Sequence, residues 1–394
     1  MIKITFLFVL FSIVIIISLS SIFSMIKSLP QLEINFLDKV FGQTTTAMDD
    51  LYSIGPLIST RNNFNLTTGE LKSDHSPIEY DAYYIPGLKN GTCPSENSPD
   101  LKKGIVIYIH GFLVNGDTLG SENATEIFDR VKKSINNSTN STYLIGFNWD
   151  SDITVKEKSW EIAKEVAKNN GLKLAQFISD FKKKCPETDI RLIAHSLGSR
   201  IVLTSLDFLN KNPEWNNKKF KIESVHLLGA AVDNEEVSKD PFDIVKDQTN
   251  EYKINLFELK DPVTLNGTKL AYGQAIENEV VKFTNLFSSG DDPLEWFYPM
   301  AEKNDSALGL NGAEKGISLP TNYKETDVKD EIKSICDANG RNSCDFPYNT
   351  VLGAIADVGD NHFGYIGFRD PNDTLKDDGA MDIVVSDWEK TENK

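Results

Sequence analysis

The stretch Arg191-Leu-Ile-Ala-His-Ser-Leu-Gly-Ser-Arg200 decides the fold class of this chain. It begins as an apolar run, DIRLIAH, and continues as SLGSRIVLTSLDFLN, which has the apolar spacing of an amphipathic helix. Ser196 is therefore expected on a sharp turn between a buried strand and a helix. Such a turn needs small residues two positions before and after the serine, because the strand and helix backbones crowd there. Ala194 and Gly198 meet this need, with Ala194 standing where the usual form of the motif has glycine.

Two roles are open for Ser196. A serine in front of a helix can simply accept a hydrogen bond from the first turn as an N-cap. The strand before it and the helix after it favour the second role, in which its hydroxyl is a nucleophile at a strand-to-helix elbow. A hydroxyl near its ordinary pKa is a poor nucleophile, so this role also requires a base and a site for the oxyanion.

Strand and helix patterns alternate on both sides of the elbow. Short apolar runs predict strands at 104–110, 143–149, 189–195, 222–230 and 280–287, and amphipathic spacing predicts helices at 159–184, with an interruption near Gly171, and at 196–210. This order is typical of an α/β protein with a mostly parallel sheet and helices on both faces. Residues 25–103 lead in, with EYDAYYIP (79–86) as an antiparallel edge strand. Residues 233–279 and 293–350 do not fit the alternation and are expected as cap-like or lid-like insertions.

The strand at 104–110 ends in a turn that could serve an oxyanion. In a sheet with a nucleophile elbow, the loop after an earlier strand donates one backbone N–H to the oxyanion, and the residue after the nucleophile donates another. Phe112 and Leu197 occupy these positions, and Gly111 lets the backbone approach closely. His110 is interpreted as a structural residue of this turn, and His75, His195 and His226 also receive structural interpretations.

A base must follow the nucleophile in the chain, and only one histidine follows His226. His362 lies in VGDNHFGYIGF, a glycine-rich turn where a loop could bring the imidazole back over Ser196. The order serine, acid, histidine is the one that such a sheet requires.

The acid has several candidates, because many carboxylates follow predicted strands. Asp291 and Asp292 come just after the run at 280–287, Asp261 follows INLFELK, and Asp233 follows the run at 222–230. We favour Asp291, with the other three as alternatives. The two adjacent aspartates also have a plain role as turn formers before a proline.

Together these motifs resemble the α/β-hydrolase superfamily, in particular the lipase and esterase branch with an AHSLG elbow. The resemblance covers about residues 101–370 and includes the run NLFSSGDDPLEWFYP, in which Asp291 takes the place of the acid. It implies an eight-stranded sheet and the transfer of an acyl group to water through a serine ester, without a metal or organic cofactor. The fold alone does not identify a substrate, because enzymes that catalyse different reactions share this fold.

Several features predict export. Residues 1–27 have the order of a secretory signal, with Lys3, an uncharged apolar core and then small residues, and the stretch is also long enough for an N-terminal membrane anchor. Sequons begin at Asn65, Asn90, Asn123, Asn136, Asn137, Asn140, Asn266, Asn304 and Asn372, which is typical of a glycoprotein. The four cysteines allow three pairings, of which we prefer Cys93 with Cys185 and Cys336 with Cys344. Residues 28–394 are expected to form a single domain.

The amino-acid composition limits the classes of partner that the protein can bind. The net charge of −17 excludes a nucleic-acid partner, because phosphate affinity needs clustered Lys and Arg, whereas 22 Phe, 12 Tyr and 5 Trp provide a large core. The sequence thus predicts an extracellular or cell-surface serine hydrolase that acts on a small-molecule or lipid ester, with membrane attachment through the N-terminal segment as one arrangement. Two alternatives stay open: an exported surface protein that keeps the fold without catalysis, and a serine peptidase or amidase.

Overall fold

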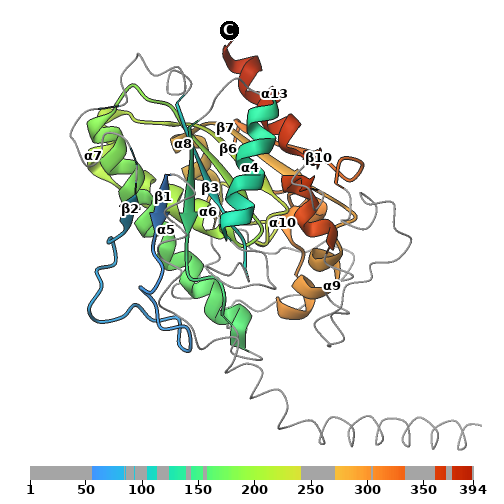
Figure 1. Ribbon diagram of the computed structural model, residues 1–394, viewed down its shortest axis with the longest axis horizontal. Coiled ribbons are helices and arrows are strands. Elements are labelled where there is room, and N and C mark those ends of the chain that lie inside the picture. Colours follow the sequence, from blue (N-terminus) through green and yellow to red (C-terminus); the bar gives the residue numbers. More distant parts are fainter. Residues whose placement is uncertain are drawn as a thin grey trace, which may run out of the picture. The chain divides into compact units, whose positions relative to one another are not determined.

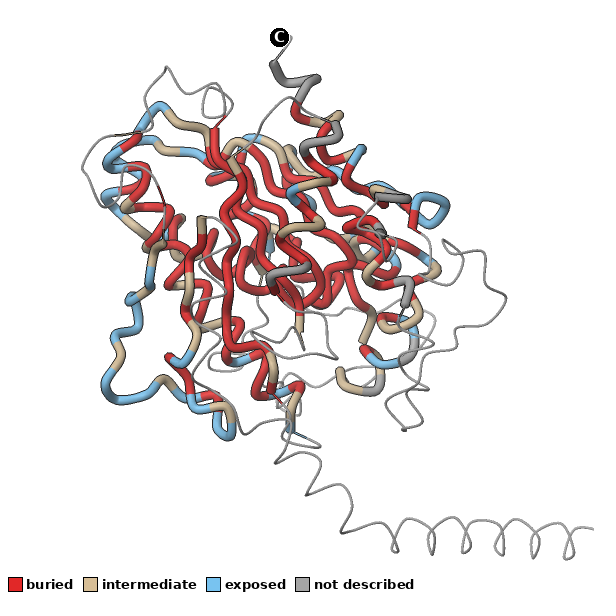
Figure 2. The backbone as a smooth tube through the Cα atoms, in the orientation of Figure 1, coloured by how far each residue is buried: buried red, intermediate tan, exposed pale blue. Residues whose placement is uncertain are grey.

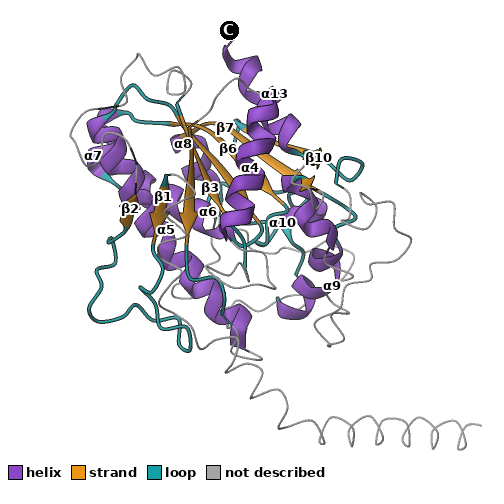
Figure 3. Ribbon diagram, viewed as in Figure 1, coloured by secondary structure: helices purple, strands orange, loops and turns teal. Residues whose placement is uncertain are grey.

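The computed structural model describes residues 56–83, 85, 93, 104–112, 124–138, 143–153, 158–240, 271–302, 305–332, 360–369 and 375–392. The chain divides into two units, residues 1–51 and 52–394, and every described residue lies in the second unit. Figure 3 shows the helices, strands and loops of the described residues. The predicted leader at 1–27 therefore lies outside the described residues. Within the described part, no helix combines the length and the apolar character that crossing a membrane requires.

The centre of the second unit is an eight-stranded sheet in the order β2-β1-β4-β3-β5-β6-β7-β8 (Figure 1). The strands are β1 (Leu57–Ser59), β2 (Asp81–Tyr83), β3 (Ile105–Ile109), β4 (Tyr143–Asn148), β5 (Ile190–His195), β6 (Ile222–Leu228), β7 (Val280–Phe287) and β8 (Tyr323–Asp327). Only β2 runs antiparallel to its neighbour, and all other pairs are parallel. The predicted α/β class and the antiparallel edge strand at 79–86 are both confirmed. A two-stranded sheet of β9 (Phe368–Arg369) and β10 (Leu375–Asp377) follows.

The helices connect the strands and cover the sheet. They are α4 (Ala124–Ser138), α5 (Ser159–Lys184), α6 (Gly198–Asn210), α7 (Pro213–Lys218), α8 (Gly273–Glu279), α9 (Asp292–Ala301), α10 (Leu308–Asn311), the 3-10 helix η4 (Asp360–Ile366) and α13 (Met381–Glu392). Parallel strands need such crossovers, which is why helices alternate with strands along the chain.

One face of the sheet is covered by α4 and α13, which pack against each other. The strand register aligns one row across this face: Tyr108, Gly146, Ile193, His226 and Thr284. The Phe128 ring of α4 packs edge-on against Tyr108, and it lies so close to Gly146 that a side chain there would overlap it. Over the other end of the row, Asp387 of α13 accepts a hydrogen bond from Thr284 (3.2 Å) and lies 3.4 Å from His226 Nε2.

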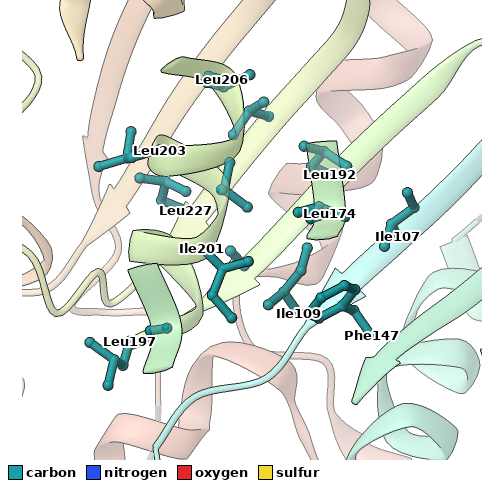
Figure 4. Close-up of a cluster of buried hydrophobic side chains, with 14 of the residues drawn as sticks. Ile107, Ile109, Phe147, Leu174, Leu192, Leu197, Ile201, Leu203, Leu206 and Leu227 are labelled. Atoms are coloured by element: carbon teal, nitrogen blue, oxygen red, sulfur yellow. The ribbon is translucent and has the colours of Figure 1, made fainter. Parts of the chain in front are cut away.

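The opposite face of the sheet forms the main hydrophobic core with α5, α6 and α8. Successive residues of a strand point to opposite faces, so the positions between those of the row point here. Figure 4 shows strand residues such as Ile107, Ile109 and Leu192 packed against Ile201 and Leu206 of α6, all of them buried. In Figure 2 the central strands are buried along their length, as expected for a parallel sheet covered on both faces.

The interruption expected near Gly171 is absent, because α5 runs without a break from Ser159 to Lys184. Gly171 instead lies against α6, where a Cβ atom would come within 2.6 Å of Thr204 Cβ. The glycine therefore permits the close packing of two helices and does not end one.

The two expected insertions contain parts of the core. Within 233–279, α8 buries Ala275 and Ile276 against the main core. Within 293–350, residues 323–327 form β8, the edge strand beside β7. Its sequence, YKETD, is polar and largely exposed, so apolar periodicity could not reveal it.

Candidate active site

The elbow at Ser196 has the geometry that its sequence predicts. Ser196 follows β5 directly, and α6 begins two residues later at Gly198. Its φ is +53°, a conformation that residues other than glycine rarely adopt and that concentrates at functional sites. The carbonyl of Leu228, at the end of β6, accepts a hydrogen bond from Ser196 N–H at 3.0 Å. Ala231 N–H donates to the Ser196 carbonyl at 3.2 Å, so both backbone groups of the turn are held from the neighbouring strand's end.

Two glycines let the β3 loop run directly against this elbow. A Cβ atom at Gly198 would lie 2.6 Å from the His110 carbonyl oxygen, and one at Gly111 would lie 2.7 Å from Ser196 Cβ. Neither position can hold a side chain without moving the backbone. Ala194, by contrast, is accommodated and fully buried between Ile109 and Leu227 of the adjacent strands.

The oxyanion candidates lie on either side of this contact. Leu197 is the buried N-cap residue of α6, so its N–H belongs to the helix end where N–H groups have no carbonyl partner within the helix. Phe112 follows Gly111 and is half-buried, with its ring edge-on to Trp160 at 5.7 Å. A helix N-terminus also favours negative charge through its dipole, which suits an oxyanion.

His362 and Asp291 are in direct contact. His362 lies on η4, and its Nδ1 is 2.7 Å from Oδ2 of Asp291. Both side chains are buried, the aspartate completely. A carboxylate can only accept a hydrogen bond, so the imidazole donates one from Nδ1. This leaves Nε2 able to accept a proton.

Asp291 is held in place by the residues around it. It is the N-cap residue of α9, and its Oδ1 accepts a hydrogen bond from Leu294 N–H at 3.1 Å. The buried Tyr365 hydroxyl lies between the same carboxylate and the Gly309 carbonyl, which is 3.4 Å away. Burial and the Asp291 charge raise the pKa of Tyr365 well above its usual range, so it stays a neutral donor.

The other acid candidates are placed differently. Asp292 is the first residue of α9 and is partly exposed, while burial and the neighbouring Glu295 and Asp291 raise its pKa. Asp233 accepts a hydrogen bond from the Tyr298 hydroxyl at 2.5 Å. Asp261 lies outside the described residues. Of the described candidates, Asp291 is the one bonded to His362.

A hydrogen bond to the backbone carbonyl of His362 holds this residue beside the elbow. His195, the residue before Ser196, has its Nε2 2.8 Å from the carbonyl oxygen of His362. Among the described residues, no hydrogen bond joins the Ser196 hydroxyl to the His362 ring itself. Catalytic hydrogen bonds of this kind are often long without substrate and shorten in the complex.

His110 is a buried structural residue, as its sequence context indicates. Its Nδ1 lies 2.9 Å from the Gly111 carbonyl oxygen, and Trp149 N–H donates to Nε2 at 3.3 Å. An acceptor faces Nδ1, and Nε2 faces both the Trp149 N–H and Oδ1 of Asn148, which is 3.2 Å away. Burial and then the Arg61 charge lower the pKa of His110 to about 3.

We expect His110 to make the protein sensitive to acid. Because its folded pKa lies below the value of about 6.5 in the unfolded chain, only the unfolded state takes up this proton as the pH falls below 6.5. This group should therefore lower the free energy of unfolding by about 2 kcal/mol as the pH falls from 6.5 to 4.5. His110→Asn keeps a hydrogen-bond donor near the place of Nδ1. Urea unfolding of the wild type and this variant would show that the difference between their free energies of unfolding becomes smaller by this amount at the lower pH. A gap that does not change with pH would contradict the assignment.

The apolar side chains that follow Asp291 divide between the core and the surface. Leu294 and Tyr298 are buried in the main core, whereas the Phe297 ring is exposed. The structure therefore assigns the first two to packing. The side chain of Trp296 lies outside the described residues.

The predicted disulfide between Cys93 and Cys185 is confirmed. It links the lead-in segment to the residue that ends α5. Cys336 and Cys344 lie outside the described residues, so their pairing stays a prediction.

Residues 95–278 match the model of a family described as alpha/beta hydrolase of unknown function (DUF900). The eight-stranded, mostly parallel sheet with its helices is consistent with an α/β-hydrolase fold. A search of the curated proteins found no match.

Solved structures show faint likenesses. A cutinase-like protein from Cryptococcus sp. is 14% identical over 34% of this chain and 55% of its own, with a TM-score of 0.23. The Trichoderma reesei cutinase is 20% identical over 32% and 52%, with a TM-score of 0.21. An acetylxylan esterase is 12% identical over 72% and 97%, with a TM-score of 0.31. The chain thus spans about half the length of the two cutinases, and the fold assignment rests on the strand order and the family match.

Sequence reasoning missed two features around the site. One is the contact of His195 with His362, which joins residues 167 positions apart and leaves no local signal. The other is a buried ion pair between Arg200 in the first turn of α6 and Glu236 after β6, with Nη2 2.9 Å from Oε1. An arginine inside the apolar run SRIVLTSL was the available sign of the ion pair, because a buried cation needs a partner.

Proposed function

We propose that this protein is a serine hydrolase that cleaves carboxylic esters, with Ser196 as nucleophile, His362 as base and Asp291 as the acid that orients it. The observation that carries the proposal is the buried 2.7 Å contact between His362 and Asp291, on a loop tied to the residue before Ser196. The positive φ of Ser196 and the match to an α/β-hydrolase family support it.

The geometry supports acyl transfer in two stages. His362 Nε2 takes the hydroxyl proton as Ser196 Oγ attacks the ester carbonyl, and the N–H groups of Phe112 and Leu197 bind the resulting oxyanion. When the oxyanion collapses, the ester C–O bond breaks and the alcohol leaves with the proton from His362. Water then attacks the acyl-enzyme, giving its proton to His362, and the carboxylic acid departs as Ser196 regains its hydrogen.

Asp291 has two effects in this scheme. Its acceptor oxygen keeps the imidazole proton on Nδ1, so that Nε2 faces the nucleophile unprotonated. Its negative charge also stabilises the imidazolium that forms during each step. No step in this scheme requires a metal or an organic cofactor.

A fluorophosphonate probe tests the proposal, because it reacts with an activated serine and forms a stable ester. We expect the wild type to be labelled at Ser196, as shown by peptide mass spectrometry, and Ser196→Ala to remain unlabelled. Ser199→Ala is the matched control, since Ser199 is a buried serine less than one turn further along and its hydroxyl has no hydrogen-bond partner among the described residues. Absence of labelling in well-folded wild type would reject the enzymatic function and favour a non-catalytic surface protein.

Substrate class needs a separate measurement. We propose a small-molecule or lipid ester, and the alternative is a peptide or amide. Rates on p-nitrophenyl esters of increasing chain length, set beside rates on the corresponding anilides, distinguish the two. A preference for anilides would replace the esterase assignment with a peptidase or amidase.

We also propose that the protein is exported, as a single domain beginning near residue 28. The Cys93–Cys185 disulfide supports this, because such bonds persist in oxidising compartments. Secretion after cleavage of residues 1–27 and retention at the membrane through the same residues are both compatible with the sequence.

A further inference from the structure

His195 lies at the junction between the candidate nucleophile and the candidate base. It is the last residue of β5 and precedes Ser196 directly, and only 1% of its surface is exposed. Its Nε2 lies 2.8 Å from the backbone carbonyl oxygen of His362, which is 167 residues further along the chain. The hydrogen bond is thus made to the main chain of the candidate base and not to its ring nitrogens.

The chemistry of this contact fixes the proton on His195. A carbonyl oxygen only accepts hydrogen bonds, so His195 Nε2 must carry the hydrogen. Burial, together with the nearby charge that His362 can carry, lowers the pKa of His195 well below its usual value. The ring is therefore neutral, with its proton on Nε2.

Packing reinforces the hydrogen bond. The His195 ring lies 4.6 Å from the His362 ring, 5.4 Å from that of Phe363 and 6.2 Å from that of Tyr365, measured between centroids. All three partners belong to η4. His195 therefore contacts the element that carries the base at several points, from the side of the nucleophile.

We propose that His195 is a positioning residue, which holds the main chain at His362 so that the imidazole stays within reach of the Ser196 hydroxyl. This inference rests on the proposed function of Ser196 and His362. Asp291 fixes the orientation of the imidazole ring, whereas His195 fixes where its backbone lies. Two consecutive residues of one strand end then provide the nucleophile and the anchor for its base.

Two substitutions separate the hydrogen bond from the bulk of the side chain. In His195→Gln the amide nitrogen can occupy the place of Nε2 and still donate to the His362 carbonyl. In His195→Asn the amide nitrogen corresponds to Nδ1 and cannot reach. On a p-nitrophenyl ester we expect His195→Asn to lose about 10²-fold in kcat, as for a misplaced catalytic group, with KM within about twofold. We expect His195→Gln to recover most of that loss.

His226→Asn is the control for the loss of a buried histidine. His226 lies on the next strand, paired in register with Ile193, and faces Asp387 of α13 away from the elbow. We expect this variant to unfold at lower temperature with kcat nearly unchanged. Equal losses of kcat in His195→Asn and His195→Gln, or no loss in either, would overturn the proposal.

Nuclear magnetic resonance of ¹⁵N-labelled histidine gives a reading that does not depend on activity. At pH 7 we expect the His195 ring of the wild type to be neutral with its proton on Nε2. A proton on Nδ1, or on both nitrogens, would overturn the proposal. If the fluorophosphonate probe fails to label the wild type, the proposed function fails, and this spectrum still decides whether His195 holds the His362 carbonyl.

Discussion

Replacing Asp291 by asparagine is expected to lower kcat about 10⁴-fold, with little change in KM. An asparagine side chain has nearly the same size and can still accept a hydrogen bond from Leu294 N–H, so the start of α9 should persist. Its amide can, however, donate to His362 Nδ1, where the carboxylate only accepts. The imidazole would then carry its proton on Nε2 and could not accept one from Ser196. Steady-state kinetics on a p-nitrophenyl ester, with circular dichroism to check folding, measure this effect.

The neighbouring carboxylates provide matched controls for Asp291. Asp292 is adjacent in sequence but begins α9 and is partly exposed, so Asp292→Asn should change kcat by no more than about twofold, within the usual size of a surface effect. Asp261→Asn belongs in the same comparison, since Asp261 was an alternative in the sequence. A loss at Asp292 or Asp261 that exceeds the loss at Asp291 would show that the acid has been misassigned.

Breaking the Arg200–Glu236 pair is expected to have the largest effect on stability. Both side chains are 2% exposed, and the guanidinium lies 2.9 Å and 3.4 Å from the two carboxylate oxygens. Burial raises the pKa of Glu236 above its usual range even though Arg200 opposes this, so the carboxylate depends on its partner for its charge. Arg200→Met leaves that carboxylate buried and unpaired, which should cost about 3–5 kcal/mol of unfolding free energy.

A double substitution separates this cost from the loss of the arginine's volume. Arg200→Met with Glu236→Leu removes both charges and should recover most of the stability, because well-packed apolar residues can replace a buried pair at little cost. Lys211→Met, which breaks the solvent-accessible pair between Asp207 of α6 and the C-cap residue of that helix, should change the free energy of unfolding by less than about 1 kcal/mol. Urea unfolding at pH 7 measures all three. Equal destabilisation of the single and double variants would contradict the predicted coupling.

The parts of the fold that follow from apolar periodicity were predictable. Strands β3 to β7 are mostly buried, so each is rich in apolar residues in the sequence. Strand β8 was not predicted, because it lies at the sheet edge and its side chains face solvent. Helix α9 was also missed, since Asp291, Asp292 and Pro293 indicate a turn as readily as a helix start. Edge elements need little apolar surface and therefore leave little pattern.

The residues of the candidate site also differ in how far local sequence could predict them. Ser196 could be named because an elbow constrains its immediate neighbours to be small, and His362 because only one histidine follows the strands. For the acid, the sequence favoured Asp291 but left three other aspartates open, since many carboxylates follow strands in a chain of net charge −17. Its contact with His362 crosses 71 residues and depends on how β7 and η4 meet. Contacts of this length, like that of His195, are properties of the folded chain.

The Cys93–Cys185 bond turns 92 residues of sequence separation into a covalent ring that holds β3, α4, β4 and α5. A single backbone cut between residues 94 and 184 would leave the two fragments joined through sulfur, and they would separate only on reduction. Ser196, Asp291 and His362 all lie beyond the ring, on one uninterrupted fragment. If the protein is exported as proposed, this arrangement would keep a chain cut by an external protease in one covalent piece.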